Sequence, residues 1–242
     1  MMLDKDGYDL VCTSAVDVGE AQRARLNSVV IDGLGASVGE MFRGFSASFP
    51  HTVAAIEREY AVAIVLCRRF QSTWIASLAA EGRALNLFFY LVPETLVTEG
   101  PEFERKCAML PARWKELYRY FDSFMLTEDS YLSIDWTNTP FSYSGRLSIE
   151  RYRVLRGVKK AVIRDFVKSI QANSEHYLRC WLLTDAGDAL FLDEEKRDGK
   201  VYHVKDDNFA DHQVLNDPET VLDHYLAHYV TTQSPEGFDF RA

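Results

Sequence analysis

Apolar and polar positions along the first part of the chain follow a mostly helical period. Between Phe49 and Ala84, apolar side chains recur every three or four residues, which is the spacing of one helix face. We therefore predict one long helix or two stacked helices over 49–84, beginning near Pro50, whose ring suits a first helical turn. The apolar run 85–92 fits either a buried strand or a short core helix, and the weak pattern of residues 1–20 fits an edge strand or an arm.

The second part of the chain alternates helical and strand patterns. Residues 110–121 have helical spacing, "SYLSIDW" (130–136) alternates as a strand, and residues 147–170 predict a second amphipathic helix capped by Ser148. Three short strands are predicted over 176–185, 188–195 and 200–206, with turns at 186–187 and 197–199. A last helix is predicted over 216–230, with Asp217 as its cap, Pro218 in its first turn and an apolar stripe of Val221, Leu222, Tyr225, Leu226 and Tyr229.

These patterns predict an α+β fold with two parts. Residues 1–100 are expected to form a helical N-terminal subdomain. Residues 101–242 are expected to form a mostly antiparallel sheet flanked by helices. Because no Gly-, Ser- or Pro-rich linker separates them, the two parts should share a large interface.

Composition narrows the class of protein. Apolar residues make up 47% of the 242 residues and charged residues 26%, as in an ordinary globular protein. The longest apolar run, 60–67, is far shorter than a membrane span, and the acidic start of the chain lacks a secretory pattern. We therefore expect a cytoplasmic protein with no membrane partner. The four cysteines lie far apart in the sequence, which favours reduced, buried thiols over a zinc or redox pair.

Negative charge is concentrated at the end of the chain. Residues 181–242 carry 14 acidic and 5 basic side chains, a net charge of −9 that equals the charge of the whole protein. An acidic surface repels nucleic acid and attracts a basic protein. It also promotes solubility without any partner, and the basic side chains of 147–170 could neutralise part of it inside the fold.

Three local patterns suggest a cofactor, metal or catalytic site, but each departs from the chemistry it would need. "GLGASVG" (33–39) has its third glycine one position late for a dinucleotide loop. His224 and His228 share a helix face, but the glutamate of a zinc protease is absent beside the first. Asp185 or Asp188 with Glu194 and Lys196 resembles the magnesium site of restriction-type nucleases, in acidic surroundings that would repel a phosphodiester. We predict no metal, no cofactor and no catalytic residue.

Four stretches from Leu110 onward follow a recognisable order. They are "LPARWKELYRYFD" (110–122), "GRLSIERYRVL" (145–155), "TDAGDALFLDEE" followed by "GKVYHVKDDN", and the final "DPETVLDHYLAHYV". In this order they resemble the SUKH superfamily. The resemblance implies an immunity protein of a type VI or contact-dependent toxin system, one that binds a secreted antibacterial toxin, often a nuclease, and occludes its active site. An effector adaptor or chaperone of a secretion system is the alternative, and an enzyme with scattered catalytic residues is a third.

The predicted toxin-binding residues are acids and one aromatic of the last quarter of the chain, all expected to be exposed. They are Asp185, Asp188, Asp193, Glu194, Glu195, Asp198, Tyr202, Asp206, Asp207 and Asp211. Their partner is expected to be a basic toxin or effector protein, since complementary charge accelerates association.

Overall fold

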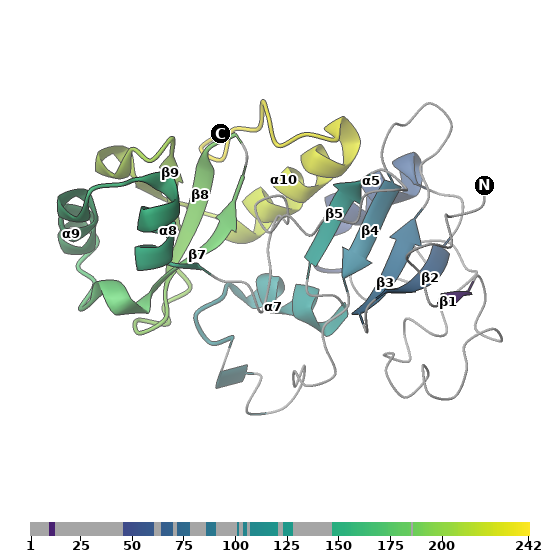
Figure 1. The fold of residues 1–242 in the computed structure, drawn as a ribbon, viewed down its shortest axis with the longest axis horizontal. Helices are drawn as coiled ribbons and strands as arrows, with labels where there is room; N and C mark the ends of the chain where they lie inside the picture. Colours follow the sequence, from purple (N-terminus) through teal and green to yellow (C-terminus); the bar gives the residue numbers. More distant parts are fainter. Residues whose placement is uncertain are drawn as a thin grey trace.

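The computed structural model describes two antiparallel sheets and the helices around them. It describes residues 10–12, 46–60, 64–69, 72–77, 86–90, 101, 104–105, 107–120, 123–127, 147–184 and 186–242; for the strands before residue 128 and for 118–120 it describes the backbone alone. Figure 1 shows the two sheets at opposite ends of the long axis, with helix α10 (Pro218–Thr232) running between them. The predicted α+β class is confirmed.

The first sheet has the strand order β1-β2-β3-β4-β5, with every pair antiparallel. Its strands are β1 (Leu10–Cys12), β2 (Ile64–Arg69), β3 (Ser72–Ser77), β4 (Asn86–Tyr90) and β5 (Ser123–Thr127). β1 forms one edge, in agreement with the predicted edge strand, and β4 decides the choice left open for 85–92 in favour of a strand. Because β5 comes from beyond residue 100, the sheet crosses the predicted boundary at that position.

The predicted helix over 49–84 is wrong beyond residue 59. Helix α5 spans Pro50–Glu59 and begins at Pro50 as predicted, but β2 and β3 then form a hairpin with Arg69 opposite Ser72. Only Phe70 and Gln71 connect the two strands, and neither is a residue typical of hairpin turns. A continuous apolar run such as 60–67 fits a helix face and a buried strand equally, and its β-branched residues pack well in a sheet.

The second sheet has the order β10-β9-β8-β7-β6, again with antiparallel pairs. Its strands are β6 (Leu147–Ser148), β7 (Leu178–Leu183), β8 (Asp188–Asp193), β9 (Tyr202–Lys205) and β10 (Gln213–Val214). The three strands predicted from sequence are confirmed as β7, β8 and β9. The predicted strand 130–136 and the loop after it lie outside the described residues.

The predicted helix over 147–170 is divided into two. Ser148 caps α8 (Ile149–Arg156) as predicted, by accepting the Arg151 N–H, but α9 spans Lys160–Ser169. Gly157 lies between them in the left-handed region at φ +68°, and the Val158 N–H donates to the Arg153 carbonyl. This is a Schellman motif with glycine at the helix terminus. It ends α8 although the apolar pattern of the predicted helix continues to residue 170.

Both faces of the second sheet are covered, so every residue of β8 is buried. On one face, α8 and α9 place Tyr152, Ile163 and Phe166 against Phe191, together with the 3-10 helix Phe209–Asp211. On the other face, Trp181 stacks on Trp114 of α7 (Ala112–Tyr120) with 4.0 Å between ring centroids. Another 3-10 helix, Glu175–Tyr177, leads into β7.

Candidate functional site

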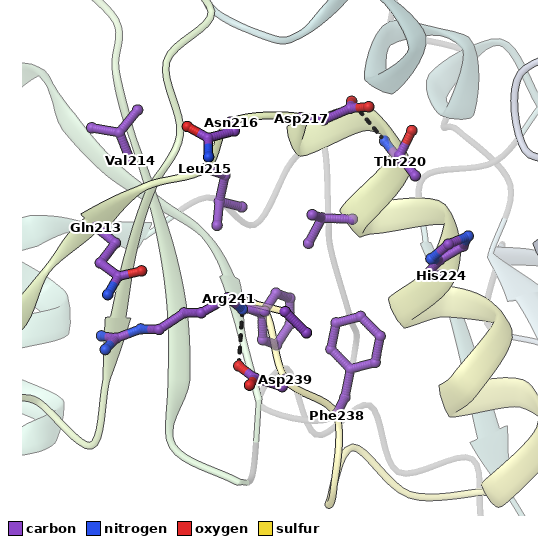
Figure 2. Close-up of a pocket in the computed structure, with 13 residues that line it drawn as sticks. Gln213, Val214, Leu215, Asn216, Asp217, Thr220, His224, Phe238, Asp239 and Arg241 are labelled. Carbon is purple, nitrogen blue, oxygen red and sulfur yellow. Dashed lines mark hydrogen bonds between the residues drawn. The ribbon is translucent and has the colours of Figure 1, made fainter.

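A pocket of about 370 Å³ opens beside the second sheet, at its β10 edge (Figure 2). Three segments form its walls: residues 213–217, the first two turns of α10, and residues 238–242. Figure 2 shows Thr220 and His224 on the α10 side and Gln213 and Val214 on the strand side. The pocket therefore lies between two elements that are adjacent in sequence and a third that returns from the end of the chain.

An aromatic cluster holds the end of the chain against α10 and forms the apolar part of the pocket. The ring of Phe240 is buried and lies 4.9 Å from that of Tyr225 and 4.9 Å from that of Phe238. Leu215, also buried, lines the pocket from the strand side. The alternation of Phe238 and Phe240 is the sequence signal that could have identified this segment, and sequence reasoning missed it.

A chain of polar contacts fixes Arg241 away from α10. Its Nε donates to His203 Nδ1 at 3.1 Å, and its two terminal nitrogens donate to the carboxylate and the backbone carbonyl of Asp211 at 2.8 and 2.6 Å. Figure 2 shows the guanidinium lying toward the strands. The bond with Arg241 also holds the pKa of the Asp211 carboxyl below its usual value. The charge of Arg241 is thus matched within the fold.

The same contacts fix the tautomer of His203. His203 and Asp188 are both buried, and His203 Nε2 lies 2.7 Å from Asp188 Oδ1. Because an arginine Nε can only donate, His203 Nδ1 must accept, and Nε2 carries the proton that is shared with Asp188. Phe240 stacks on the imidazole with 5.1 Å between ring centroids. Through His203, this aspartate–histidine pair connects the sheet to Phe240 and Arg241 at the end of the chain.

The acidic residues that remain in the pocket are not matched in this way. Asp217 caps α10 by accepting the Thr220 N–H at 3.1 Å, as predicted, and hydrogen bonds from Thr220 hold the pKa of its carboxyl below its usual value. Asp239 accepts the Arg241 backbone N–H at 2.9 Å. With Asp211, three carboxylates lie in or beside the pocket, against the guanidinium of Arg241 and that of Arg113, which is close enough to act on Asp217. The pocket is therefore apolar inside and acidic around it.

The ten predicted toxin-binding residues do not form one surface. Asp188, Asp193 and Tyr202 are buried, so the prediction that they are exposed is wrong. Asp193 Oδ1 instead accepts the N–H groups of Glu195 and Lys196 at 2.9 and 3.2 Å, which closes the turn after β8. The alternation of a strand cannot reveal burial when both faces of its sheet are covered.

Four more of these residues take part in ion pairs. Glu194 pairs with Arg179 at 2.9 Å, Asp198 with Lys200 at 3.6 Å, and Asp211 with Arg241 at 2.8 Å. Asp207 accepts from Tyr152 at 2.7 Å and from Arg156 at 3.1 Å, which ties α8 to the turn after β9. Among these cations only Arg156 belongs to the predicted basic helix, so α8 neutralises Asp207 while the other acids pair with the sheet, its turns and the end of the chain.

Two of these residues, Glu195 and Asp206, are exposed without an ion pair among the described residues, while Asp185 lies outside them. Glu195 lies at the turn that follows β8, and Asp206 lies beside Gly187 at the opposite end of that strand. The six residues of β8 separate these ends by roughly 17 Å at about 3.3 Å per residue. Any partner that contacts both turns must therefore span the length of β8.

The nuclease-like constellation is not assembled. Asp188 begins β8 and Glu194 follows its end, so the strand holds their carboxylates apart. Lys196 Nζ donates to the Ile170 carbonyl at 2.7 Å, toward the end of α9. The residues proposed for this chemistry thus serve the packing of the sheet.

His224 and His228 have separate surroundings. The exposed His224 lies edge-on to His51 of α5 with 4.4 Å between ring centroids, and His228 Nε2 lies 2.8 Å from the Glu236 carbonyl oxygen. Among the described residues, no three His, Cys, Asp or Glu side chains are grouped so that they could hold a metal ion. The "GLGASVG" segment lies outside the described residues.

Outside the pocket, α8 carries an exposed apolar pair. Val154 and Leu155 are 64% and 60% exposed, one helical turn after Arg151.

Within the described part of the chain, no helix has the length and apolar character to cross a membrane. Comparison with known proteins found no match to this chain among family models, curated proteins or solved structures.

Proposed function

We propose that this protein binds a basic toxin or effector protein and neutralises it by covering its active site, as an immunity protein does. The observation that carries this proposal is the acidic charge left at the surface of residues 181–242 after internal pairing. Lys200 and Arg241 are matched by acids of the same segment, while Glu195 and Asp206 keep unpaired, exposed carboxylates among the described residues. Exposed charge of one sign accelerates association with a partner of the opposite sign.

The resemblance of residues 110–242 to the SUKH superfamily supports the same proposal. The resemblance implies a helix, a strand and a loop, a second helix, strands with a Gly-Asp step and a last helix. The chain has α7, α8, β7 to β9 and α10 in that sequence, and the strand expected over 130–136 lies outside the described residues. A nuclease is the toxin class that best fits an acidic inhibitor, because its active site is built to attract phosphates.

The test begins with an affinity-tagged copy of the full chain, used to isolate its partner from the native host at low and high salt. The partner's candidate toxin domain is then expressed in a sensitive host, with and without this protein. We expect a basic partner whose capture weakens at high salt, and survival of the host only when the two proteins are co-expressed. If co-expression leaves the domain toxic while its export depends on this protein, the chain is an effector adaptor and the proposal is wrong.

The residue-level test uses Glu195, because its side chain is exposed and supports no turn. Glu195→Lys should reduce the association rate severalfold at low salt, and the difference should shrink as salt is added. Glu57→Lys, at an exposed acid of α5, is the matched control. Equal effects of the two variants would remove the β8–β9 turn from the contact surface. Asp193 is excluded from this test because its carboxylate holds that turn together.

A further inference from the structure

We infer that the pocket between β10 and α10 is a docking site for an extended segment of a partner protein, one that alternates apolar and basic side chains. The choice of a basic partner rests on the proposed function. The inference adds where on this protein that partner makes contact. Three observations carry it: the pocket itself, the free edge of β10, and the charge around the pocket.

The free edge follows from the hydrogen-bond register. The Leu215 N–H donates to the Val201 carbonyl at 2.9 Å, and Val214 lies opposite Tyr202. In an antiparallel ladder, consecutive residues bond in alternate directions, so the N–H and C=O of Val214 point away from β9. Among the residues that the structure describes, β10 is the last strand of its sheet. An added strand can therefore bond to Val214 and continue the sheet.

The pocket supplies the space that such a strand needs for a side chain. Leu215 and Phe240 form buried parts of its wall, while the side chain of Val214, opposite Tyr202, lies on the other face of the sheet. A volume of about 370 Å³ accommodates one or two aliphatic side chains. Removing the apolar surface of the pocket from water favours binding.

The charge around the pocket selects the other side chains of the segment. Asp217 and Asp239 line the pocket, and Asp211 lies beside it. The guanidinium of Arg241, in contrast, is already bonded to Asp211 and His203. Lysine or arginine on the incoming segment meets carboxylates there, while the same carboxylates repel an acidic segment, since Arg241 is bonded to Asp211 and Arg113 pairs with Glu219. The site therefore fits a basic and apolar segment better than an acidic one.

The direct test uses a fluorescein-labelled octapeptide of alternating lysine and leucine, and its twin in which glutamate replaces lysine. Binding to the full chain is followed by fluorescence anisotropy and by methyl NMR shifts of valine and leucine. We expect the lysine peptide to bind at least tenfold tighter than its twin, with shifts concentrated at Val214, Leu215 and Val221. Equal binding of both peptides, no binding up to millimolar concentration, or shifts centred on α8 would overturn the inference.

The chain offers a matched pair of variants. Val214→Arg places a positive charge beside the β10 edge with which the peptide would pair, and it should weaken binding of the lysine peptide at least tenfold. Val154→Arg makes the same replacement at an exposed valine of α8 and should leave binding unchanged. Thr220→Arg tests the same prediction from the α10 wall, and circular dichroism checks that each variant is folded. Equal loss in Val154→Arg and Val214→Arg would show that added charge alone, and not the pocket, controls binding.

The two proposals fail in different ways. If Val214→Arg still protects a host against the toxin while Glu195→Lys does not, the toxin is bound elsewhere and only the pocket inference fails. If the lysine peptide binds at the pocket but co-expression never protects a host, the docking site stands and the immunity function fails.

Discussion

The carboxylate of Asp223, in the middle of α10, accepts the backbone N–H of Thr52 at 2.8 Å and also the Thr52 hydroxyl at 2.8 Å. Its second oxygen accepts the His51 N–H at 3.1 Å. Phe49, at the start of α5, supplies no side-chain cap of its own. A side chain of α10 therefore caps α5 across 171 residues of sequence, and Asp223 and Thr52 are both buried.

One turn earlier, α10 does the same for a second helix. Glu219 Oε1 accepts the Arg113 N–H at 3.0 Å in the first turn of α7, and the Pro218 carbonyl accepts from the Trp114 indole at 3.0 Å. Acidic side chains at helix N-termini are favoured by the positive end of the helix dipole. Because α10 also carries the pocket wall, the two capped helices and the candidate site depend on one element.

Asp223→Ala should destabilise the protein strongly. It removes the cap of α5 and leaves buried N–H and hydroxyl donors without partners, which should cost about 2–4 kcal/mol of unfolding free energy in urea titrations. Asp223→Asn keeps one acceptor oxygen and should lose about half as much. Asp165→Ala, at an exposed acid of α9, serves as the control and should change the unfolding free energy by less than about 0.5 kcal/mol. Equal effects of the alanine variants would argue against long-range capping.

Two glycines with positive φ should respond differently to alanine. Gly157 at φ +68° has open space where a Cβ would lie, so Gly157→Ala should cost only about 1 kcal/mol of backbone strain. At Gly187, φ is +88° and the added Cβ would lie 2.5 Å from Asp206 Oδ1, so the loss should be larger. Adding Asp206→Ala should restore part of the Gly187→Ala loss but none of the Gly157→Ala loss. Chemical unfolding of the five variants, singles and doubles, measures this difference.

The buried hydroxyl of Tyr152 should make the protein sensitive to alkali. Burial, together with its hydrogen bond to Asp207, raises the pKa of Tyr152 above its usual value of 10.0. In the unfolded chain the phenol ionises near its usual pKa, so the unfolded state binds fewer protons above that pH and stability falls as pH rises. Burial also raises the pKa of Tyr60, Tyr202 and Cys180 in the same direction.

The measurement is the unfolding free energy at about pH 9 and about pH 11 for the wild type and for Tyr152→Phe. The variant loses the hydrogen bond to Asp207 at both pH values but should show a smaller decrease between them. The other raised groups contribute equally to both proteins, so the difference isolates Tyr152. A decrease identical to that of the wild type would show that this phenol does not control the alkaline transition.

His203 should accept a hydrogen bond at Nδ1 and donate one from Nε2 to Asp188. This follows from Arg241 donating to Nδ1 and from the 2.7 Å contact with Asp188. The ¹⁵N shifts of the imidazole in the folded protein report the tautomer directly. Arg241→Gln should remove the restraint on Nδ1 and loosen the end of the chain, raising hydrogen exchange around Phe240. A proton found on Nδ1 in the wild type would contradict the assignment.

Where local chemistry is decisive, the sequence predicted the structure well. Asp217 and Pro218 identified the start of α10, Ser148 the start of α8, and Pro50 the start of α5. Three strands of the second sheet, β7 to β9, were predicted from the glycine turns between them, while the two-residue strands β6 and β10 were not predicted. For the first sheet the same reasoning failed, because the β2–β3 connection carries no turn residue and its apolar residues fit both periods.

The candidate site was harder to predict than the fold, since it depends on which surfaces meet. Asp188, Asp193 and Tyr202 look like surface residues in sequence, yet all three are buried in the second sheet. Arg241 pairs with Asp211 and His203, at separations of 30 and 38 residues, and no local pattern predicts such a pair.

By itself, the sequence determined the α+β class, the local caps of α8 and α10 and the concentration of acidic charge in residues 181–242, because these depend on neighbouring residues and on composition. Only the tertiary structure decided which acids remain exposed, which are matched by basic side chains, that α10 caps α5 and α7, and that the end of the chain folds back to form a pocket with β10 and α10. The physical reason is that burial and ion pairing depend on distances between elements, which the chain sets only when its layers pack together.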